Sequence, residues 1–137
     1  MLRDIKRQMP IDRQFSFSRR TIALWLTMIA MICAAYLLGR YHKNHRYDSL
    51  VECMAAKQVK MYGAYWCPHC ADQKDILGAS YRFVYEECGV PGSHEVQRKC
   101  LDLGVKLFPT WRFPDGALTP GVFSAEALSL RSGCSLP

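Results

Sequence analysis

The sequence contains no internal repeat and no low-complexity stretch, and its 137 residues are too few to build two full-sized hydrophobic cores. A multidomain enzyme is therefore excluded. Because 50% of the residues are hydrophobic and only 22% are charged, a disordered or collagen-like chain is excluded as well. The composition predicts one small packed domain with an additional segment.

Net charge is nearly missing from residues 41–137, which hold eleven Lys and Arg against ten Asp and Glu. Residues 1–40 hold seven basic and two acidic residues, so most of the formal net charge of +6 lies there. A domain that binds nucleic acid usually presents a basic excess on its own surface. We therefore expect no nucleic-acid partner.

Charged residues are absent from 21–39, a stretch of nineteen residues between Arg20 and Arg40. As a helix this stretch would be roughly 28 Å long, which matches the hydrocarbon core of a bilayer. It is longer than a signal-peptide core, and no small-x-small cleavage pattern follows it, so we predict a retained transmembrane helix. Six basic residues precede it and three follow it closely, which places the N-terminus in the cytoplasm and the C-terminal domain outside.

Four parts are therefore expected along the chain. They are a basic cytoplasmic tail, a transmembrane helix, a polar tether and a folded domain, at residues 1–20, 21–39, 40–46 and 47–137.

Hydrophobic periodicity and capping residues in the folded domain predict four helices and four strands. Ser49 and Glu52 form a capping-box pattern for the first helix. The predicted order is α-β-α-β-α-β-β-α, which implies a small sheet covered by helices in an α/β fold. The helices are expected at 49–57, 67–77, 93–104 and 124–133, and the strands at 59–64, 81–86, 110–113 and 117–122.

Seven cysteines in so short a chain suit the oxidising compartment outside the cytoplasm, and two of them form a Cys-x-x-Cys motif, Cys67 and Cys70. The N-terminus of a helix stabilises a thiolate at Cys67, and Cys70 lies one turn later, where it can resolve a mixed disulfide. Pro68 suits the first turn of that helix. When protonated, His69 would favour the reduced pair and make the disulfide a stronger oxidant.

Half of a zinc site is the alternative interpretation of a Cys-x-x-Cys pair. Cys88 and Cys100 could complete four ligands, but eleven residues separate them, whereas a zinc ribbon brings a second closely spaced pair. We therefore expect no metal.

Three blocks of sequence carry a family resemblance. Residues 60–74 (KMYGAYWCPHCADQK), 86–100 (EECGVPGSHEVQRKC) and 108–111 (FPTW) are similar to the thioredoxin-like domain fused to vitamin K epoxide reductase homologues of bacteria, cyanobacteria and plastids. The resemblance covers most of residues 47–132. It implies a compact thioredoxin-like fold that lacks the usual first strand.

The same resemblance implies roles for individual residues. Cys67 and Cys70 would be the redox pair, supported by Trp66, and Cys88 and Cys100 would form a structural disulfide. Pro109 would be a cis-proline that faces the redox pair, where the neighbouring backbone can pair with an extended substrate. The domain would then lie in the periplasm or the thylakoid lumen, with the N-terminus cytoplasmic or stromal.

Two departures from the family matter for function. The fused relatives carry a helical membrane module that passes electrons to a quinone, whereas this chain has one span, so its electron acceptor is expected to be a separate membrane protein. Reducing thioredoxins keep a buried acid six residues before the first active cysteine, and here that residue is Met61. Without the acid, Cys70 has no evident proton acceptor unless Glu86 or a water replaces it, which favours an oxidase or isomerase.

The other three cysteines are expected to be thiols. Cys33 lies within the apolar stretch, Cys53 on the apolar face of the first predicted helix, and Cys134 in the tail after the last one. Since the first and last helices of a thioredoxin fold cover opposite faces of the sheet, we expect no disulfide between Cys53 and Cys134.

The sequence thus predicts a membrane-anchored thiol-disulfide oxidoreductase that forms or rearranges disulfides in exported proteins and needs no cofactor. Its expected partners are exported protein thiols and disulfides and a separate membrane oxidant, quinone-linked or similar to vitamin K epoxide reductase. Two alternatives remain: a thiol reductase for an extracytoplasmic assembly pathway, and a redox-inactive binding module or metallochaperone that uses Cys67, His69 and Cys70.

Overall fold

A computed structural model describes residues 18–137 of the chain. Residues 1–17, which make up most of the predicted basic tail, lie outside the described residues. The chain divides into two compact units, one up to Leu37 and one from Leu38 to Pro137. Each is described by itself.

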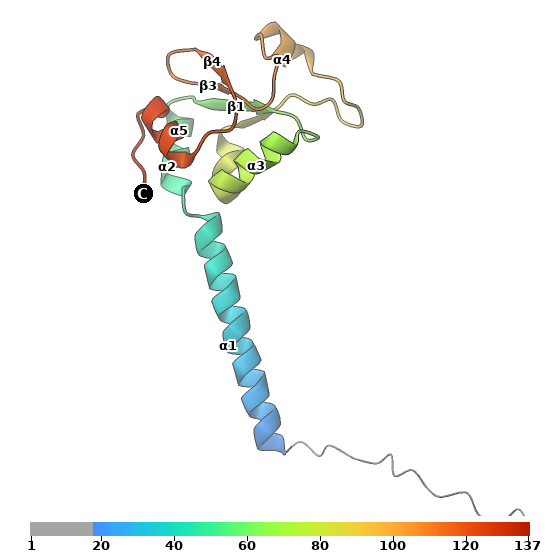
Figure 1. Cartoon of the computed structure of the whole chain (residues 1–137), viewed down its shortest axis with the longest axis vertical. Helices are drawn as coiled ribbons and strands as arrows, with labels where there is room; N and C mark the ends of the chain where they lie inside the picture. Colours follow the sequence, from blue (N-terminus) through green and yellow to red (C-terminus); the bar gives the residue numbers. More distant parts are fainter. Residues whose placement is uncertain (1–17) are drawn as a thin grey trace, which may run out of the picture. The chain divides into compact units, whose positions relative to one another are not determined.

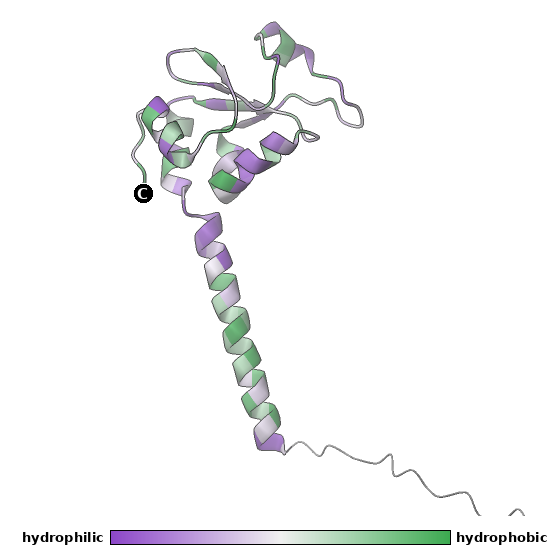
Figure 2. Ribbon diagram, viewed as in Figure 1, coloured by the Kyte–Doolittle hydropathy of each residue, from purple (hydrophilic) through white to green (hydrophobic). Residues whose placement is uncertain are grey.

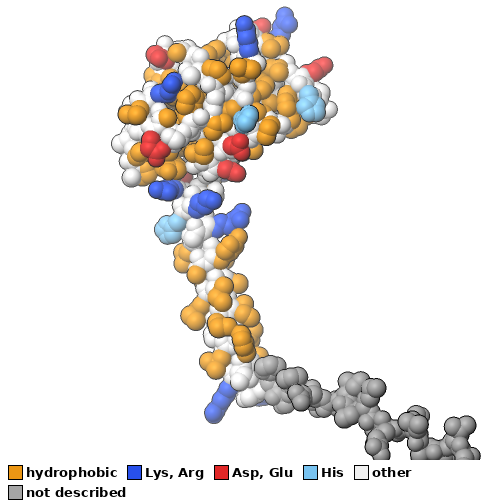
Figure 3. Space-filling view, in the orientation of Figure 1, with side chains coloured by type: hydrophobic (Ala, Val, Ile, Leu, Met, Phe, Trp, Pro, Cys, Tyr) orange, Lys and Arg blue, Asp and Glu red, His pale blue; other side chains and the backbone are white. Residues whose placement is uncertain are grey.

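Helix α1 (Arg19–Asn44) is the long apolar helix predicted from the uncharged stretch. The hydrophobic residues run along its middle (Figure 2), none of its residues is buried, and Figure 3 shows the apolar side chains on one face of the helix. It is long and apolar enough to cross a membrane. Residues 40–44, predicted as part of a tether, continue the helix.

Strands β1 to β4 form one four-stranded sheet in the order β2-β1-β3-β4 (Figure 1). Strand β1 pairs with β2 in parallel and with β3 in antiparallel orientation, and β3 pairs with β4 as a hairpin. This mixed architecture confirms the predicted fold class and is compatible with a thioredoxin-like fold. The strands are β1 (Lys60–Gly63), β2 (Tyr85–Glu87), β3 (Thr110–Arg112) and β4 (Leu118–Pro120).

Helices cover both faces of the sheet, three on one face and one on the other (Figure 1). Alternation along β1 directs Met61 to the first face and Tyr62 to the second. The first face holds the larger core, with Trp111 at its centre and fully buried. Its helices are α2 (Asp48–Ala56), α3 (Pro68–Leu77) and α5 (Ala125–Ser132), and α4 (Arg98–Asp102) covers the second face.

The predicted last helix is confirmed together with both of its caps. Ser124 is the N-cap of α5, and its hydroxyl accepts a hydrogen bond from the backbone N–H of Ala127 at 3.3 Å. Gly133 ends the helix in the left-handed conformation, at φ 65°.

The capping box predicted for the first helix is wrong. Helix α2 has Tyr47 as its N-cap and makes no side-chain capping bond. The carboxylate of Asp48 instead accepts a hydrogen bond from the Ser80 hydroxyl and pairs with His45, and the Ser80 bond lowers the Asp48 pKa most strongly. Because the helix already begins at Asp48, Ser49 is its second residue rather than its N-cap.

Two predicted elements are shorter than expected. Residues 81–86 were predicted as a strand, but a 3-10 helix, η1 (Gly78–Phe83), occupies its first half, and pairing begins only at Tyr85. Residues 93–104 were predicted as one helix, but α4 begins only at Arg98. The Ser93 hydroxyl accepts from the N–H of Glu95 in a local turn, which competes with helix formation.

Cys53 and Cys134 are joined by a disulfide, with a Cα–Cα distance of 5.9 Å, so the prediction of two thiols is wrong. The prediction placed the first and last domain helices on opposite faces, whereas α2 and α5 pack into the same core. Cys134 is accordingly buried rather than exposed. The bond closes a loop that contains almost the whole folded domain.

Candidate redox site

Cys67 lies at the N-cap of α3, four residues after the buried end of β1 at Gly63. Its extended backbone (φ −84°, ψ 116°) turns the chain into the helix, and Pro68 occupies the first helical position. The first N–H groups of a helix lack intrahelical partners and carry a partial positive charge, which stabilises a sulfur anion at this position. The side chain is half-buried, so a large reactant can reach it.

Cys70, one turn further along α3, is only 1% exposed. Burial raises the pKa of its thiol, and a hydrogen bond with Cys67 raises it further. Both cysteines are free thiols in this structure. The pair thus combines one accessible sulfur with one buried sulfur.

The loop before β3, which contains Phe108 and Pro109, lies next to Cys67. The Phe108–Pro109 peptide bond is cis, Pro109 is buried, and the Cys67 thiol donates a hydrogen bond to the Phe108 carbonyl at 3.5 Å. The structure therefore brings together three residues that the sequence singled out separately, Cys67, Cys70 and Pro109.

Trp66 packs against the loop that follows β2. A Cβ added to Gly89 would lie 2.4 Å from the Trp66 ring, so only glycine allows this approach. The ring also lies 5.3 Å from that of His94, between centroids. Trp66 therefore holds the segment before Cys67 against the 88–96 loop.

His69 lies between the two cysteines in sequence, and its side chain is exposed to solvent. Its side chain is 71% exposed and pairs with the Asp72 carboxylate at 3.5 Å. Because Asp72 offsets its charge and water screens it, His69 acts on the redox pair more weakly than the sequence indicated.

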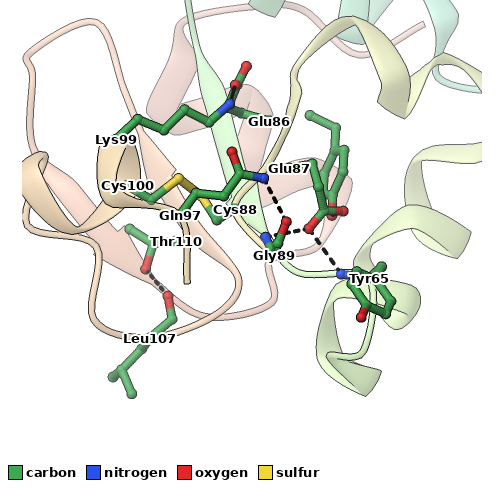
Figure 4. The surroundings of a disulfide bond; sticks show 11 residues. Tyr65, Glu86, Glu87, Cys88, Gly89, Gln97, Lys99, Cys100, Leu107 and Thr110 are labelled. Atoms are coloured by element: carbon green, nitrogen blue, oxygen red, sulfur yellow. Dashed lines mark hydrogen bonds and ion pairs between the residues drawn. A yellow bond between two sulfur atoms is a disulfide. The ribbon is translucent and has the colours of Figure 1, made fainter. Parts of the chain in front are cut away.

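The disulfide between Cys88 and Cys100 joins the residue after β2 to helix α4 on the second face of the sheet (Figure 4). Both residues are fully buried, which leaves their sulfurs out of reach of large reactants. Next to them, Lys99 forms an ion pair with Glu86, the carboxylate suggested as a proton acceptor for Cys70. Strand alternation puts Glu86 on the face opposite Cys70, so it is not the nearby acid.

Glu87 is the carboxylate near the redox helix, and the sequence analysis missed it. One of its oxygens accepts hydrogen bonds from the N–H groups of Tyr65 (3.2 Å) and Gly89 (2.6 Å), as Figure 4 shows. The other accepts from the Tyr85 hydroxyl at 2.7 Å. Spacing of two residues from Tyr85 on the same strand was the available signal, but the predicted strand ended at Glu86, one residue before Glu87.

In the part of the chain that the structure describes, no three His, Cys, Asp or Glu residues are grouped as metal ligands. The zinc set considered from the sequence is broken up, because two of its four cysteines are joined in a disulfide. The remaining pair, Cys67 and Cys70, faces the cis-proline loop.

No known family profile matches this chain. The chain is similar to the thiol-disulfide oxidoreductase LTO1 of Arabidopsis thaliana, with 38% identity over 83 residues. The match covers 57% of this chain but only 22% of LTO1, so the chain corresponds to about a fifth of that relative. Similarity to a thiol-disulfide oxidoreductase agrees with the chemistry that the cysteine pair allows.

Proposed function

We propose that this protein is a membrane-anchored thiol-disulfide oxidoreductase that forms or rearranges disulfides in exported proteins. The observation that carries the proposal is the pairing of Cys67, accessible at a helix N-terminus, with Cys70, buried one turn later. The similarity to LTO1 supports a general thiol-oxidoreductase role. Trp66, Pro68 and Pro109 support the site by fixing the backbone around the two sulfurs.

In the oxidising direction, a substrate thiolate attacks the sulfur of Cys67 in the Cys67–Cys70 disulfide. Cys70 leaves with the electron pair and takes up a proton, and the substrate is held by a mixed disulfide to Cys67. A second substrate thiolate attacks the substrate sulfur of that bond and releases Cys67 as a thiolate. The substrate has lost two electrons and the protein has gained them, and a separate membrane oxidant must remove them.

The cis-proline loop has a place in this scheme. The Phe108 carbonyl lies beside the Cys67 sulfur, so backbone next to Pro109 can pair with an extended substrate chain while the mixed disulfide exists. Such pairing uses main-chain groups, which suits an enzyme with many substrates.

The length and composition of α1, which suit a membrane span, support the proposed anchoring. The basic residues before it favour an N-terminus in the cytoplasm or stroma and a domain in the periplasm or thylakoid lumen. In that compartment the disulfides Cys53–Cys134 and Cys88–Cys100 would persist.

Trapping of mixed disulfides tests the proposal. In native membranes, the Cys70→Ser variant should accumulate exported proteins bound through Cys67, because the resolving thiol is gone. The matched Cys67→Ser variant should trap none. Equal trapping by both variants, or by neither, would contradict the proposal.

A thiol reductase is the second candidate, and the carboxylate of Glu87 near the redox helix favours it. The reduction potential separates the two functions, since thioredoxin-fold proteins range from about −120 mV for strong oxidants to about −270 mV for reductants. We expect a value nearer the oxidising end, measured by equilibrating the protein with glutathione. A value at the reducing end would favour the reductase.

A further inference from the structure

The redox reaction proposed above requires Cys70 to gain and lose a proton while it is buried. When Cys70 attacks a mixed disulfide, its S–H proton must leave, and when Cys70 is the leaving group, a proton must return. Burial opposes the charged thiolate. A group near the Cys70 sulfur must therefore exchange this proton, and Met61 cannot.

The register of the sheet places another residue next to Met61. In the parallel pair β1–β2, Tyr85 lies opposite Met61, and Glu87 lies opposite Gly63. Residues two apart on a strand share a face, so Tyr85 and Glu87 face the same side as Met61, which is the side that α3 covers.

Gly63 leaves a space that Cys70 and Tyr85 fill from two sides. A Cβ on Gly63 would lie 2.9 Å from the Cys70 sulfur, 2.7 Å from a Tyr85 ring carbon and 3.4 Å from the Tyr85 hydroxyl oxygen. The sulfur and the hydroxyl thus border the same point. Any larger residue at Gly63 would separate them.

The Tyr85 hydroxyl is connected to Glu87 on its other side. It donates a 2.7 Å hydrogen bond to one oxygen of Glu87, whose second oxygen is held by two backbone N–H groups. Glu87 is half-buried and so retains contact with solvent. Lys74 of α3 lies 3.8 Å from the centre of the Tyr85 ring and adds a positive charge near the Cys70 sulfur.

We propose that Tyr85 and Glu87 form a proton relay between Cys70 and solvent. This inference rests on the proposed redox function. As Cys70 attacks, its proton passes to the Tyr85 oxygen, directly or through one water, while the Tyr85 proton passes to the Glu87 carboxylate. The sulfur electron pair forms the Cys67–Cys70 bond, and the substrate sulfur leaves with the electrons of the broken bond. The reverse transfer protonates Cys70 when it is the leaving group.

The relay replaces, from a neighbouring strand, the buried acid that the sequence lacks at Met61. Tyr85 would exchange the proton, and Glu87 would act through Tyr85. The raised pKa of Tyr85, caused first by burial and then by the hydrogen bond to Glu87, keeps the hydroxyl protonated between turnovers. The other ionisable groups that face Cys70 are Cys67 and Lys74, and β1 contributes none.

A chromogenic aromatic disulfide separates the two steps in the reduced full-length protein. Attack by Cys67 releases one coloured thiolate, and attack by Cys70 on the resulting mixed disulfide releases a second. A Cys33→Ala background removes the remaining free thiol among the described residues. Stopped-flow absorbance then gives one rate for each cysteine.

Tyr85→Phe keeps the ring and removes the hydroxyl, and Glu87→Gln keeps the shape and removes the charge. Both should leave the first phase within about twofold of wild type and slow the second by roughly a hundredfold or more. The matched control Glu86→Gln, on the other face of the sheet, should change neither phase.

Dependence on pH distinguishes a relay from a packing role. Without the relay, Cys70 must lose its proton to hydroxide, so the second phase in both variants should rise more steeply with pH than in wild type. A second phase with wild-type rate and pH dependence in both variants would overturn the relay. Absence of a second phase in the wild-type protein would instead overturn the proposed function, and the relay with it.

Discussion

The disulfide between Cys53 and Cys134 should contribute more to stability than the one between Cys88 and Cys100. The bonds span 81 and 12 residues of sequence. The chain-entropy relation gives about 4.5 kcal/mol for the longer loop and about 3 kcal/mol for the shorter one at 25 °C. Either value is a large fraction of the free energy of unfolding of a domain of this size.

Two proteins with one structural disulfide each allow the comparison. One carries Cys88→Ala and Cys100→Ala, and the other carries Cys53→Ala and Cys134→Ala. The redox pair is also replaced by alanine in both, so that a reductant breaks one bond only. Because each protein is compared with its own reduced form, the loss of packing caused by the substitutions cancels.

Guanidinium unfolding of the full chain in mild detergent, followed by tryptophan fluorescence, gives the free energies. Trp111 is fully buried in the larger core and reports loss of the domain structure. Reduction should lower the free energy of unfolding by about 1.5 kcal/mol more in the protein that keeps the long-range bond. An equal or smaller loss in that protein would refute the entropic argument.

Residues 41–137 should fold as a monomer without the span, since the larger core consists of residues from this part alone, and aggregation of the fragment outside detergent would contradict this. Replacing His69 by Ala should lower the reduction potential by at most a few tens of millivolts, and Asp72→Asn should raise it, because the Asp72 carboxylate pairs with His69. Equilibration with glutathione measures both potentials. A large fall in the potential of the His69→Ala variant would show that His69 acts on the redox pair more strongly than its exposure indicates. Burial raises the pKa of Cys70 above its ordinary value near 9, so the reduced protein should have its full stability below that pH and lose stability as the pH rises above it. The oxidised pair does not titrate, so the melting temperature should fall more in the reduced than in the oxidised protein between about pH 8 and about pH 10. An equal fall in both forms would contradict the raised pKa of Cys70.

Local signals predicted the parts of the fold that local interactions determine. The sequence placed Cys67 and Cys70 correctly at the start of α3. The signals were a buried strand, a proline at the first helical position and two cysteines one turn apart, all within about fifteen residues. The caps of α5 were equally readable, because Ser124 and Gly133 act on their own backbone neighbourhood.

Features that depend on distant partners were not predictable in this way. Asp48 accepts a hydrogen bond from Ser80, thirty-two residues away, and α2 begins at Asp48, before the predicted cap Ser49. Tyr85 was placed on a strand that started too early, because the 3-10 helix before it also presents aromatic residues at short intervals. Its proximity to Cys70 depends on the β1–β2 register and on the missing side chain of Gly63.

Pairing of Cys53 with Cys134 also constrains how the protein matures. During synthesis, Cys53 emerges first, and four other cysteines of the domain follow before its partner does. A bond between neighbours in sequence, such as Cys53 with Cys67, would consume the nucleophile and block the native pairing. Packing of α5 into the same core as α2 brings Cys134 to Cys53, so non-covalent folding favours the native bond over the others. An enzyme that handles the disulfides of others would depend on this order for its own.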